Sequence, residues 1–564
     1  MESRICQNCK NSFNIEPDDF SFYEKTKVLA PTFCPQCRMV RRLAFRNERK
    51  LFKVKDGFTE ETIFSLYPSQ SECKIVTQEE WFSDSWSAEE YAREYDFSRP
   101  FFDQLFELDR EVPIYALNEV ALIRSDYCAN TSYLKDCYLL FNSNRTENSL
   151  YGSSVDRCKD CIDNTSIGDC EKCYETFWLA RCYQCRFCIM CVECTGMWFS
   201  RDCLGCSDCF GCANLRKASH CIFNKQYSKE DYFKEIENMN LNTQAGLKEA
   251  RKKSRAFWTT QPLKYHQGLK NLNCAGAYVT NSKNVDNGYL VREGENLHYC
   301  QYMQVPKNKD CWDASIWGEN TELCYETSVC GDNAYNLKFS WDCWPSVRDS
   351  EYSMHLKSSS DCFGCVGLRS KQYCILNKQY TKEEYEEMVK KIKIHMDEMP
   401  YIDKQGNMYK YGEFFPVELS PFGYNNTSAQ EQVPITKAEA LSHGYPWTEV
   451  EKGNYTVTKT FADLPQTTEQ IDESITKEVL GCILCGSAYK IQLDEFTFLK
   501  KENIPLPDYC PECRHGRRVS DRLKPLLYHR TCDKEGCENE FDTAYGPEIP
   551  NKIYCEQCYQ QEVV

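Results

Sequence analysis

The stretch "CEKCYETFWLARCYQCRFCIMCVECTGMWFSRDCLGCSDCFGC" (170–212) holds eleven cysteines, and every gap between them is a multiple of three. The pattern extends outward, because all sixteen cysteines from Cys128 to Cys221 fall in one residue class modulo three. In blocks of twelve, such as "ARCYQCRFCIMC" (180–191), cysteines recur at the third, sixth, ninth and twelfth positions. A fixed short period predicts stacked turns with an inward position every three residues.

The cysteine-rich repeat occurs twice in the chain. The segment "DCFGCANLRKASHCIFNKQYSKEDYFKEI" (208–236) matches "DCFGCVGLRSKQYCILNKQYTKEEYEEMV" (361–389), and "KDCIDNTS...EKCYET" (159–176) matches "KDCWDASI...ELCYET" (309–327). Each copy ends in a capping-box sequence, which predicts a helix. We therefore predict a mainly β fold with some α structure: two short-repeat β-solenoid segments with capping helices, flanked by terminal zinc ribbons. The period allows turns of twelve residues or of about 24.

Three interpretations of the cysteine ladder remain open. A narrow coil admits only small side chains, and a reduced cysteine packs as a small hydrophobe. Four sulfurs converging from stacked turns would instead bind a metal, for which the candidates are Cys182, Cys185, Cys188, Cys191 and Cys194. Disulfides across the coil are the third interpretation, but a reducing compartment argues against them. The second copy replaces many ladder cysteines with Ser, Asn or Leu, and this favours packing.

The two ends of the chain carry metal-ligand motifs. Zn²⁺ favours four thiolates in a tetrahedron, and a short Cys-x2-Cys turn presents two of them. The strand-rich spacers between the turns are typical of zinc-ribbon hairpins. We predict about three structural zinc ions. The ligand sets are Cys6, Cys9, Cys34 and Cys37; Cys482, Cys485, Cys510 and Cys513; and Cys532, Cys537, Cys555 and Cys558. Because protein thiolates fill all four positions, zinc hydrolysis is disfavoured.

Arginines follow two of these motifs at helical spacing. The first set is Arg38, Arg41, Arg42, Arg46 and Arg49, and the second is Arg514, Arg517, Arg518 and Arg522. One interpretation is a phosphate-binding stripe beside each zinc ribbon. The other, slightly favoured, is a solvated face or one that pairs with the acidic middle of the chain.

The segment 51–81 can be laid on 527–559, with Thr77 and Glu80 at the positions of Cys555 and Cys558. We interpret it as a ribbon that has lost its metal. The predicted segments are a zinc ribbon (1–50), a degenerate metal-less ribbon (51–82), a helical and aromatic connector (83–124), the first solenoid (125–227), a helix and linker (228–275), the second solenoid (276–380), a helix (381–398), an irregular aromatic and proline-rich strap (399–480), and two zinc ribbons (481–525 and 526–564).

Composition limits the function classes. The chain of 564 residues carries a net charge of −16, which argues against a nucleic-acid binder that uses its whole surface. The opening "MESRICQNCKNSF" has no apolar targeting segment, and no stretch has the length of a membrane span. These features, with 38 cysteines that a cytosol would keep reduced, predict a cytoplasmic protein without membrane partners.

The order of these parts resembles a group of uncharacterised multi-zinc-ribbon, cysteine-rich proteins predicted from environmental bacterial genomes. The resemblance rests on segments such as "CPQCRMVRRLAFRNER", "YGEFFPVELSPFGYN" and "AYGPEIPNKIYCEQCYQQE". It implies zinc binding and a cytosolic location, and it implies no activity. The sequence departs from the group in the longer Cys532-x4-Cys537 turn.

The favoured function is a non-enzymatic zinc-binding scaffold that recognises a macromolecular partner, with a protein favoured over nucleic acid. An alternative is a nucleic-acid or ribosome-associated factor that uses the arginine stripes. A further alternative is a thiol-rich metal reservoir or redox sensor, which requires exposed cysteines of low pKa. No Gly-rich phosphate loop, nucleophile elbow or paired histidines point to an enzyme. Neither the partner nor the oligomeric state follows from the sequence.

Overall fold

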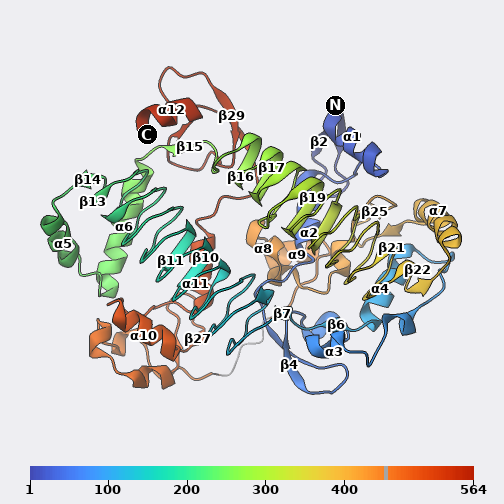
Figure 1. Ribbon diagram of the computed structural model, residues 1–564, viewed down its shortest axis with the longest axis horizontal. Helices are drawn as coiled ribbons and strands as arrows, with labels where there is room; N and C mark the ends of the chain where they lie inside the picture. The colour runs from blue at the N-terminus through green and yellow to red at the C-terminus, as the bar shows by residue number, and fades with distance from the viewer. Residues whose placement is uncertain (450–454, 564) are drawn as a thin grey trace.

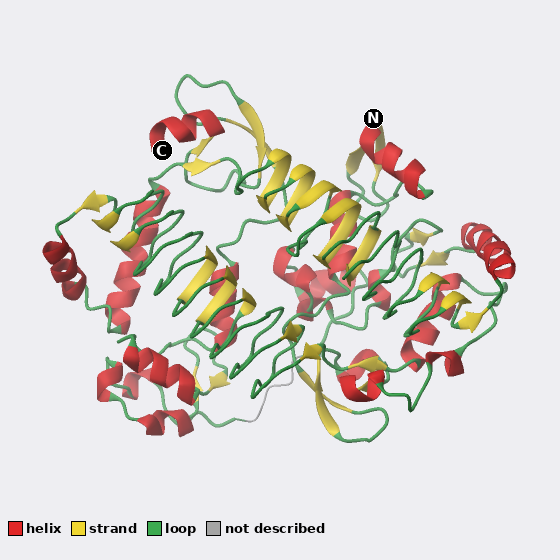
Figure 2. Cartoon of the chain, in the orientation of Figure 1, coloured by secondary structure: helices red, strands yellow, loops and turns green. Residues whose placement is uncertain are grey.

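The structure is a computed structural model that describes residues 1–449 and 455–563. These residues form a mixed α/β structure with twelve α-helices and sheets of two to five strands (Figures 1 and 2). The α-helices are α1 (Pro17–Thr26), α2 (Pro35–Leu43), α3 (Gln78–Phe82), α4 (Phe101–Glu111), α5 (Lys229–Asn238), α6 (Gln244–Thr259), α7 (Lys382–Glu398), α8 (Ser428–Gln432), α9 (Lys437–Ser442), α10 (Leu493–Lys501), α11 (Pro511–Val519) and α12 (Glu556–Val563).

The strands are mostly short. Those outside the two repeats are β1 (Glu2–Ile5), β2 (Ser12–Ile15), β3 (Phe52–Lys55), β4 (Thr62–Ser65), β5 (Ile75–Val76), β6 (Ile114–Tyr115), β15 (Leu263–Lys264), β24 (Tyr401–Ile402), β25 (Met408–Tyr409), β26 (Leu480–Gly481), β27 (Ala488–Tyr489), β28 (Tyr528–Thr531), β29 (Glu540–Thr543) and β30 (Ile553–Tyr554). Those of the first repeat are β7 (Glu119–Val120), β8 (Thr131–Ser132), β9 (Ser153–Asp156), β10 (Ile162–Gly168), β11 (Tyr174–Ala180), β12 (Ser207–Phe210), β13 (Ser219–Ile222) and β14 (Lys225–Gln226). Those of the second are β16 (Leu272–Thr280), β17 (Lys283–Arg292), β18 (Gly294–His298), β19 (Asn308–Gly318), β20 (Tyr325–Gly331), β21 (Ser360–Phe363), β22 (Gln372–Ile375) and β23 (Lys378–Gln379).

The predicted fold class, mainly β with two β-solenoid segments between zinc ribbons, is wrong: the described residues form the mixed α/β arrangement above. One reason lies in the spacers of the metal motifs, which we expected to be strands. After one short strand each, β2 and β27, the first two spacers fold as α1 and α10, because Pro17 occupies the first turn of α1 and acidic residues with a capping box begin both helices. The third spacer contains the strands β29 and β30. A second reason is that most contacts within the repeats are isolated bridges, so the sheets remain small.

The first repeat forms a stack of turns, here called stack 1 (residues 119–222). Parallel bridges join each turn to the residue twelve positions later, as in Ile123 with Lys135 and Lys135 with Glu147. Each turn is built from three-residue units: a bridged residue such as Asp126, a residue with positive φ such as Tyr127 (φ 55°), and an inward residue such as Cys128. The positive φ interrupts the extended conformation at every unit, so the bridges to the neighbouring turns recur at every third residue.

The second repeat forms stack 2 (residues 272–375), in which parallel partners lie eleven to fourteen residues apart. Its first turns carry the five-stranded parallel sheet from β16 to β20. Figure 1 shows the two stacks side by side, with α5 beyond the last turn of stack 1 and α7 beyond the last turn of stack 2. No helix in the described parts of the chain is long and apolar enough to cross a membrane.

The burial and hydrogen bonding of the inward side chains explain why cysteine is common in stack 1. Inward thiols are buried and donate hydrogen bonds to backbone carbonyls of their own coil, as Cys182 does to Ala180 O and Cys191 O at 3.4 Å each. Serine fills equivalent inward positions and donates in the same way, as Ser200 Oγ does to Trp198 O at 3.0 Å. Cys and Ser are therefore interchangeable as small inward donors, and they share the interior of the coil with apolar side chains at other inward positions, such as Val155, Ile167 and Leu179.

Candidate metal centres

Three groups of four cysteines come together within the described residues, and they are the three predicted ligand sets. In each group all four sulfurs lie within 4.8 Å of one another. One sulfur pair in each group is 3.7, 3.8 or 3.9 Å apart. A tetrahedron with Zn–S bonds of about 2.3 Å has edges of about 3.8 Å, whereas a disulfide is about 2.05 Å long. The sulfur spacing therefore fits metal ligation and does not fit disulfide bonds.

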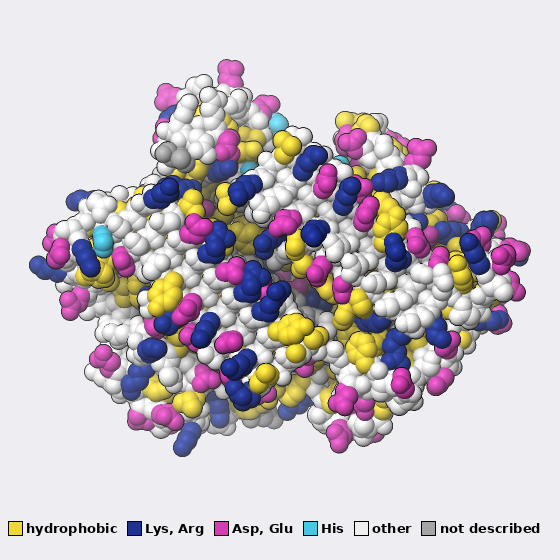
Figure 3. All heavy atoms as spheres, in the orientation of Figure 1, with side chains coloured by type: hydrophobic (Ala, Val, Ile, Leu, Met, Phe, Trp, Pro, Cys, Tyr) yellow, Lys and Arg dark blue, Asp and Glu magenta, His cyan; other side chains and the backbone are white. Residues whose placement is uncertain are grey.

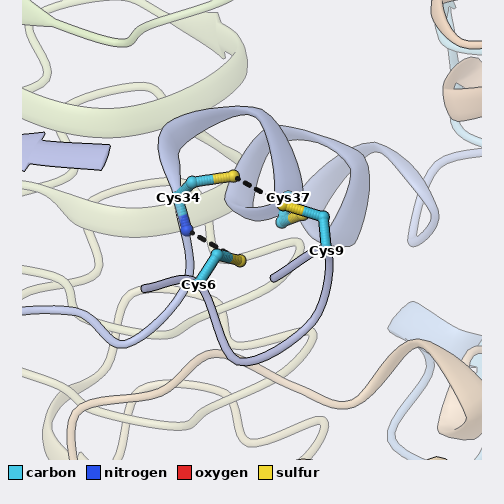
Figure 4. A group of neighbouring side chains, drawn as sticks. All are labelled: Cys6, Cys9, Cys34 and Cys37. Atoms are coloured by element: carbon cyan, nitrogen blue, oxygen red, sulfur yellow. Dashed lines mark hydrogen bonds between the residues drawn. The ribbon is translucent and has the colours of Figure 1, made fainter. Parts of the chain in front are cut away.

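The first group, from residues 6 to 37, shows how the sequence builds such a site (Figure 4). The turn after β1 carries Cys6 and Cys9, and it closes because Lys10 adopts a left-handed conformation (φ 63°) and donates to Cys6 O at 3.0 Å. The other two ligands come from α2, where Cys34 is the N-cap and Cys37 lies in the first turn. Pro35 at the first helical position fixes the start of the helix.

The second group repeats this construction. Cys482 and Cys485 lie in the turn between β26 and β27, where Gly486 (φ 74°) takes the left-handed position of Lys10. Cys510 is the N-cap of α11, and Cys513 lies in its first turn. The third group joins the turn after β28, which carries Cys532 and Cys537, to the start of α12.

Hydrogen bonds from nitrogen to sulfur surround the metal centres. The backbone N–H of Cys34 donates to Cys6 Sγ at 3.3 Å, and that of Cys555 donates to Cys532 Sγ at 3.3 Å. Asparagine side chains add further donors, from Asn8 to Cys37 Sγ at 3.3 Å and from Asn539 to Cys555 Sγ at 3.4 Å. Such donors stabilise anionic sulfur and orient the ligands around a metal.

The helix that carries two cysteines of the first group, α2, places its arginines against stack 2. Arg38 and Arg42 form ion pairs with the two oxygens of Asp313 in β19, at 2.8 and 3.0 Å. Arg41 bridges Glu326 in β20 at 2.7 Å and Glu413 of the strap at 2.8 Å. All six side chains are at most 5% exposed, so the helix is joined to the stack by a buried network of charges.

The helix that carries two cysteines of the second group, α11, lies against stack 1 through the same kind of contact. Arg514 and Arg518 pair with the two oxygens of Asp163 in β10, at 2.7 and 3.0 Å. Arg517 pairs with Glu175 in β11. In the internal repeat, Asp163 corresponds to Asp313 and Glu175 to Glu326. The two terminal motifs thus dock through the same contact, each on the stack that lies farther from it along the chain.

Burial sets the electrostatics of these contacts. It disfavours the charged form of Glu175, but Arg517 and Arg251 outweigh it and hold the pKa of this carboxyl low, at about 2. The pKa of the Arg41 guanidinium is raised, because Glu326 and Glu413 outweigh its desolvation. Glu175 on stack 1 and Arg41 on stack 2 therefore remain charged at neutral pH. Burial raises the pKa of Glu326, the partner of Arg41. A buried ion pair contributes little net stability over an apolar contact, but removal of one partner leaves an uncompensated charge.

The remaining arginines of the two predicted stripes are also largely enclosed. Arg46 is bonded to Asn142 at 2.8 Å, Arg49 pairs with Glu512 at 3.2 Å, and Arg522 pairs with Glu431 at 2.8 Å. The most exposed of the nine side chains, that of Arg517, is 25% accessible. Of the two interpretations of the stripes, the structure shows pairing with the protein's own carboxylates. A phosphate would have to displace these partners.

The five ladder cysteines proposed as an extra metal site do not form such a group within the described residues. Cys182, Cys185, Cys191 and Cys194 each donate to a backbone carbonyl nine residues later, and Cys188 donates to Arg186 O at 3.3 Å. No cysteine in the described residues is in a disulfide. Burial raises the pKa of the Cys128 thiol to about 12 and that of Cys137 to about 11, so these thiols stay protonated.

The segment interpreted as a metal-less ribbon holds a hydrogen-bonded cluster. Thr77 is the N-cap of α3 and its hydroxyl donates to Glu80 at 2.8 Å. The Asp56 carboxylate accepts from the backbone N–H groups of Thr77 at 2.9 Å and Phe58 at 2.8 Å. Side-chain oxygens thus tie the turn after β3 to the start of α3, the connection that a metal would make between thiolates.

Sequence reasoning missed the carboxylates that receive the arginines. Their signal was present in the internal repeat, where "CIDN" matches "CWDA" and "CYET" occurs in both copies. The Asp is retained although its neighbours differ, and the Glu is retained within an identical tetrapeptide. Both occupy the left-handed position of a three-residue unit (Asp163 φ 59°, Glu175 φ 51°) and not its inward position. Both repeats share these two acidic residues, and the chain has two similar arginine-rich helices. Together these features predict ion pairs between the helices and the repeats.

Comparison with known proteins provides no family for the chain. No protein-family model matches it, and no curated protein matches it.

Proposed function

We propose that the three four-cysteine sites bind structural zinc and that the protein is a non-enzymatic scaffold for a macromolecular partner. The observation that carries the proposal is the position of the first two sites. Each lies at the N-terminus of the helix whose arginines enter a buried acidic contact on a stack. A metal that fixes the first turn of the helix also fixes the direction of three guanidinium groups, and thereby holds the terminal segment on the repeat.

The ligand chemistry supports zinc. Four thiolates in a tetrahedron suit Zn²⁺ or an iron–sulfur centre, whereas Ca²⁺ and Mg²⁺ prefer oxygen. Two short turns that supply two cysteines each are typical of structural zinc sites, and four protein ligands leave no position for water or substrate. The third site fits the same role, because its segment pairs β30 with β15 between the two stacks.

The two alternatives from the sequence have less support. A nucleic-acid factor would use the arginine stripes, which are paired with carboxylates in the structure. Figure 3 shows Lys and Arg interleaved with Asp and Glu over the visible face, without a separate basic area. A redox sensor needs accessible thiolates, and the ladder thiols of stack 1 are buried. We therefore favour a protein partner. We also keep, as a proposal, the resemblance of the chain to multi-zinc-ribbon proteins.

The metal content and the free thiols of one sample test the proposal. Protein purified under reducing conditions is expected to contain about three zinc ions per chain. After denaturation with zinc retained, about 26 thiols should titrate, because twelve of the 38 cysteines are ligands. A chelator should release the zinc and raise the titratable count to 38. Fewer than two metal ions, or a substantial iron content, would contradict the proposal.

A further inference from the structure

The stacks have four ends, and three of them are covered by the chain itself. The last turn of stack 1 is closed by the antiparallel pairing of β13 with β14, and that of stack 2 by β22 with β23. The first turn of stack 2 is covered by residues 267–269, because Val279 N donates to Gln267 O and Asn281 N donates to Leu269 O. Repeat proteins need such caps, since an open sheet edge pairs with other chains.

The first turn of stack 1 differs, because its outer edge lacks backbone partners within the described residues. In the next turn Asp136 N donates back to Ile123 O at 2.9 Å, and Leu134 O accepts from Ile123 N at 2.9 Å. The equivalent groups of the first turn, Arg124 N and Leu122 O, have no preceding turn and no described backbone partner. The turn begins at β7, near the lower centre of Figure 1.

The side chains of two outward columns are apolar in this turn and polar in the next three turns. The column of Ile123 continues with Lys135, Glu147, Lys159 and Glu171. The column of Val120 continues with Ser132, Asn144, Asp156 and Gly168. Ile123 is 52% exposed and Val120 is 42% exposed. At this edge the exposed apolar pair lies beside backbone groups that lack described partners, whereas the exposed Tyr183 and Leu204, later in the same columns, lie in turns that are bonded on both sides. An edge with both features is a candidate contact surface for another chain.

We propose that this edge is covered by the same edge of a second copy, which gives a two-fold symmetric dimer. N–H groups without a backbone partner among residues 1–449 and 455–563 recur at every third residue (Ala121, Arg124), and C=O groups of the same kind follow each of them (Leu122, Ser125). A two-fold axis at Ile123 places Arg124 N opposite the second copy's Leu122 O, and Ala121 N opposite the second copy's Ser125 O. Each bond then occurs twice, as a self-complementary interface requires.

The backbone conformation favours a second copy over an ordinary strand. Ala121 (φ 52°) and Arg124 (φ 44°) are left-handed, so the free groups do not follow the two-residue repeat of an extended peptide. Another turn of the same stack has the matching three-residue repeat. The two-fold axis also brings both copies of Ile123 together, which removes their exposed surface from water.

Sedimentation velocity over a dilution series tests the dimer. The wild-type protein is expected to dimerise reversibly, and Ile123→Lys is expected to weaken dimerisation by about a hundredfold, because both copies lose a buried isoleucine and gain a charge. The variant should fold, since Lys135 occupies the same position one turn later. Ile394→Lys on α7, where Ile394 is 59% exposed, is the matched control and should leave dimerisation unchanged.

The controls keep failure of folding separate from failure of the proposal. Both variants should keep the wild-type zinc content and unfolding temperature. A wild-type protein that is monomeric throughout the series overturns the proposal and leaves the edge for a different chain. A dimer that Ile123→Lys does not weaken overturns it as well, because the contact would then lie elsewhere.

Discussion

Asp163→Ala is expected to lower the free energy of unfolding by about 3–5 kcal/mol, the cost of leaving buried charges without their partner. Asp163 is fully buried and pairs with Arg514 at 2.7 Å and Arg518 at 3.0 Å. Arg514 keeps Glu495 at 2.7 Å, but Arg518 would retain only neutral acceptors, Thr165 Oγ1 and Tyr151 O. The loss should appear in urea unfolding as a lower midpoint.

Glu193→Ala is the matched control on the same stack. Glu193 pairs with Arg181 at 2.9 Å, and both side chains are more than half exposed. Water already screens this pair, so the expected loss is about 0–1 kcal/mol. Equal effects of the two substitutions would contradict the assignment of α11 to a buried acidic contact. Asp313→Ala should reproduce the larger loss on stack 2, because Asp313 receives Arg38 and Arg42 in the same way.

How much of the fold the sequence predicts depends on the kind of pattern. The paired cysteines correctly predict which twelve cysteines come together in groups of four, because ligand pairs at short spacing leave few geometries. The three-residue period correctly identifies the inward positions but not the fold class. Hydrophobic spacing in "EFTFLKK" is compatible with a strand, and only the capping box at Gln492 and Glu495 decides for the helix. The capping residues therefore determine that this segment is a helix, and the comparison with the hairpins of zinc ribbons gave the wrong secondary structure.

The arginine helices show why the contacts between the terminal segments and the stacks are harder to predict than the cysteine groups. Spacing places Arg38, Arg41 and Arg42 near one face of a helix, but it does not reveal what that face meets. Their partners lie some 270 residues away in sequence, as the separations of 275 and 271 residues to Asp313 show. An arginine side chain can bind either a phosphate or a carboxylate. Which of the two it binds depends on which acceptor the protein positions next to it. Here the repeat holds the carboxylates on adjacent turns.

Cys510→Ser is expected to remove one zinc ion per chain and to release α11 from stack 1. A serine hydroxyl is a poor zinc ligand, and Cys510 is both a ligand and the N-cap of the helix that carries Arg514 and Arg518. Loss of a structural metal belongs to the class of substitutions that cost more than about 4 kcal/mol, so residues 480–523 should become the first site of proteolysis. Elemental analysis and limited proteolysis of the same preparation measure both effects.

The matched control replaces a ladder cysteine of stack 1. Cys188 is fully buried and donates to Arg186 O at 3.3 Å, and twelve residues later Ser200 donates to Trp198 O at 3.0 Å from the equivalent position. Cys188→Ser should therefore keep all three metal ions and the proteolytic pattern of the wild type. If Cys188→Ser lost a metal ion, the ladder would be a metal site and not a packing core. If Cys510→Ser kept three ions, the second four-cysteine site would not bind metal, and the link between zinc and the docking of α11 would be wrong.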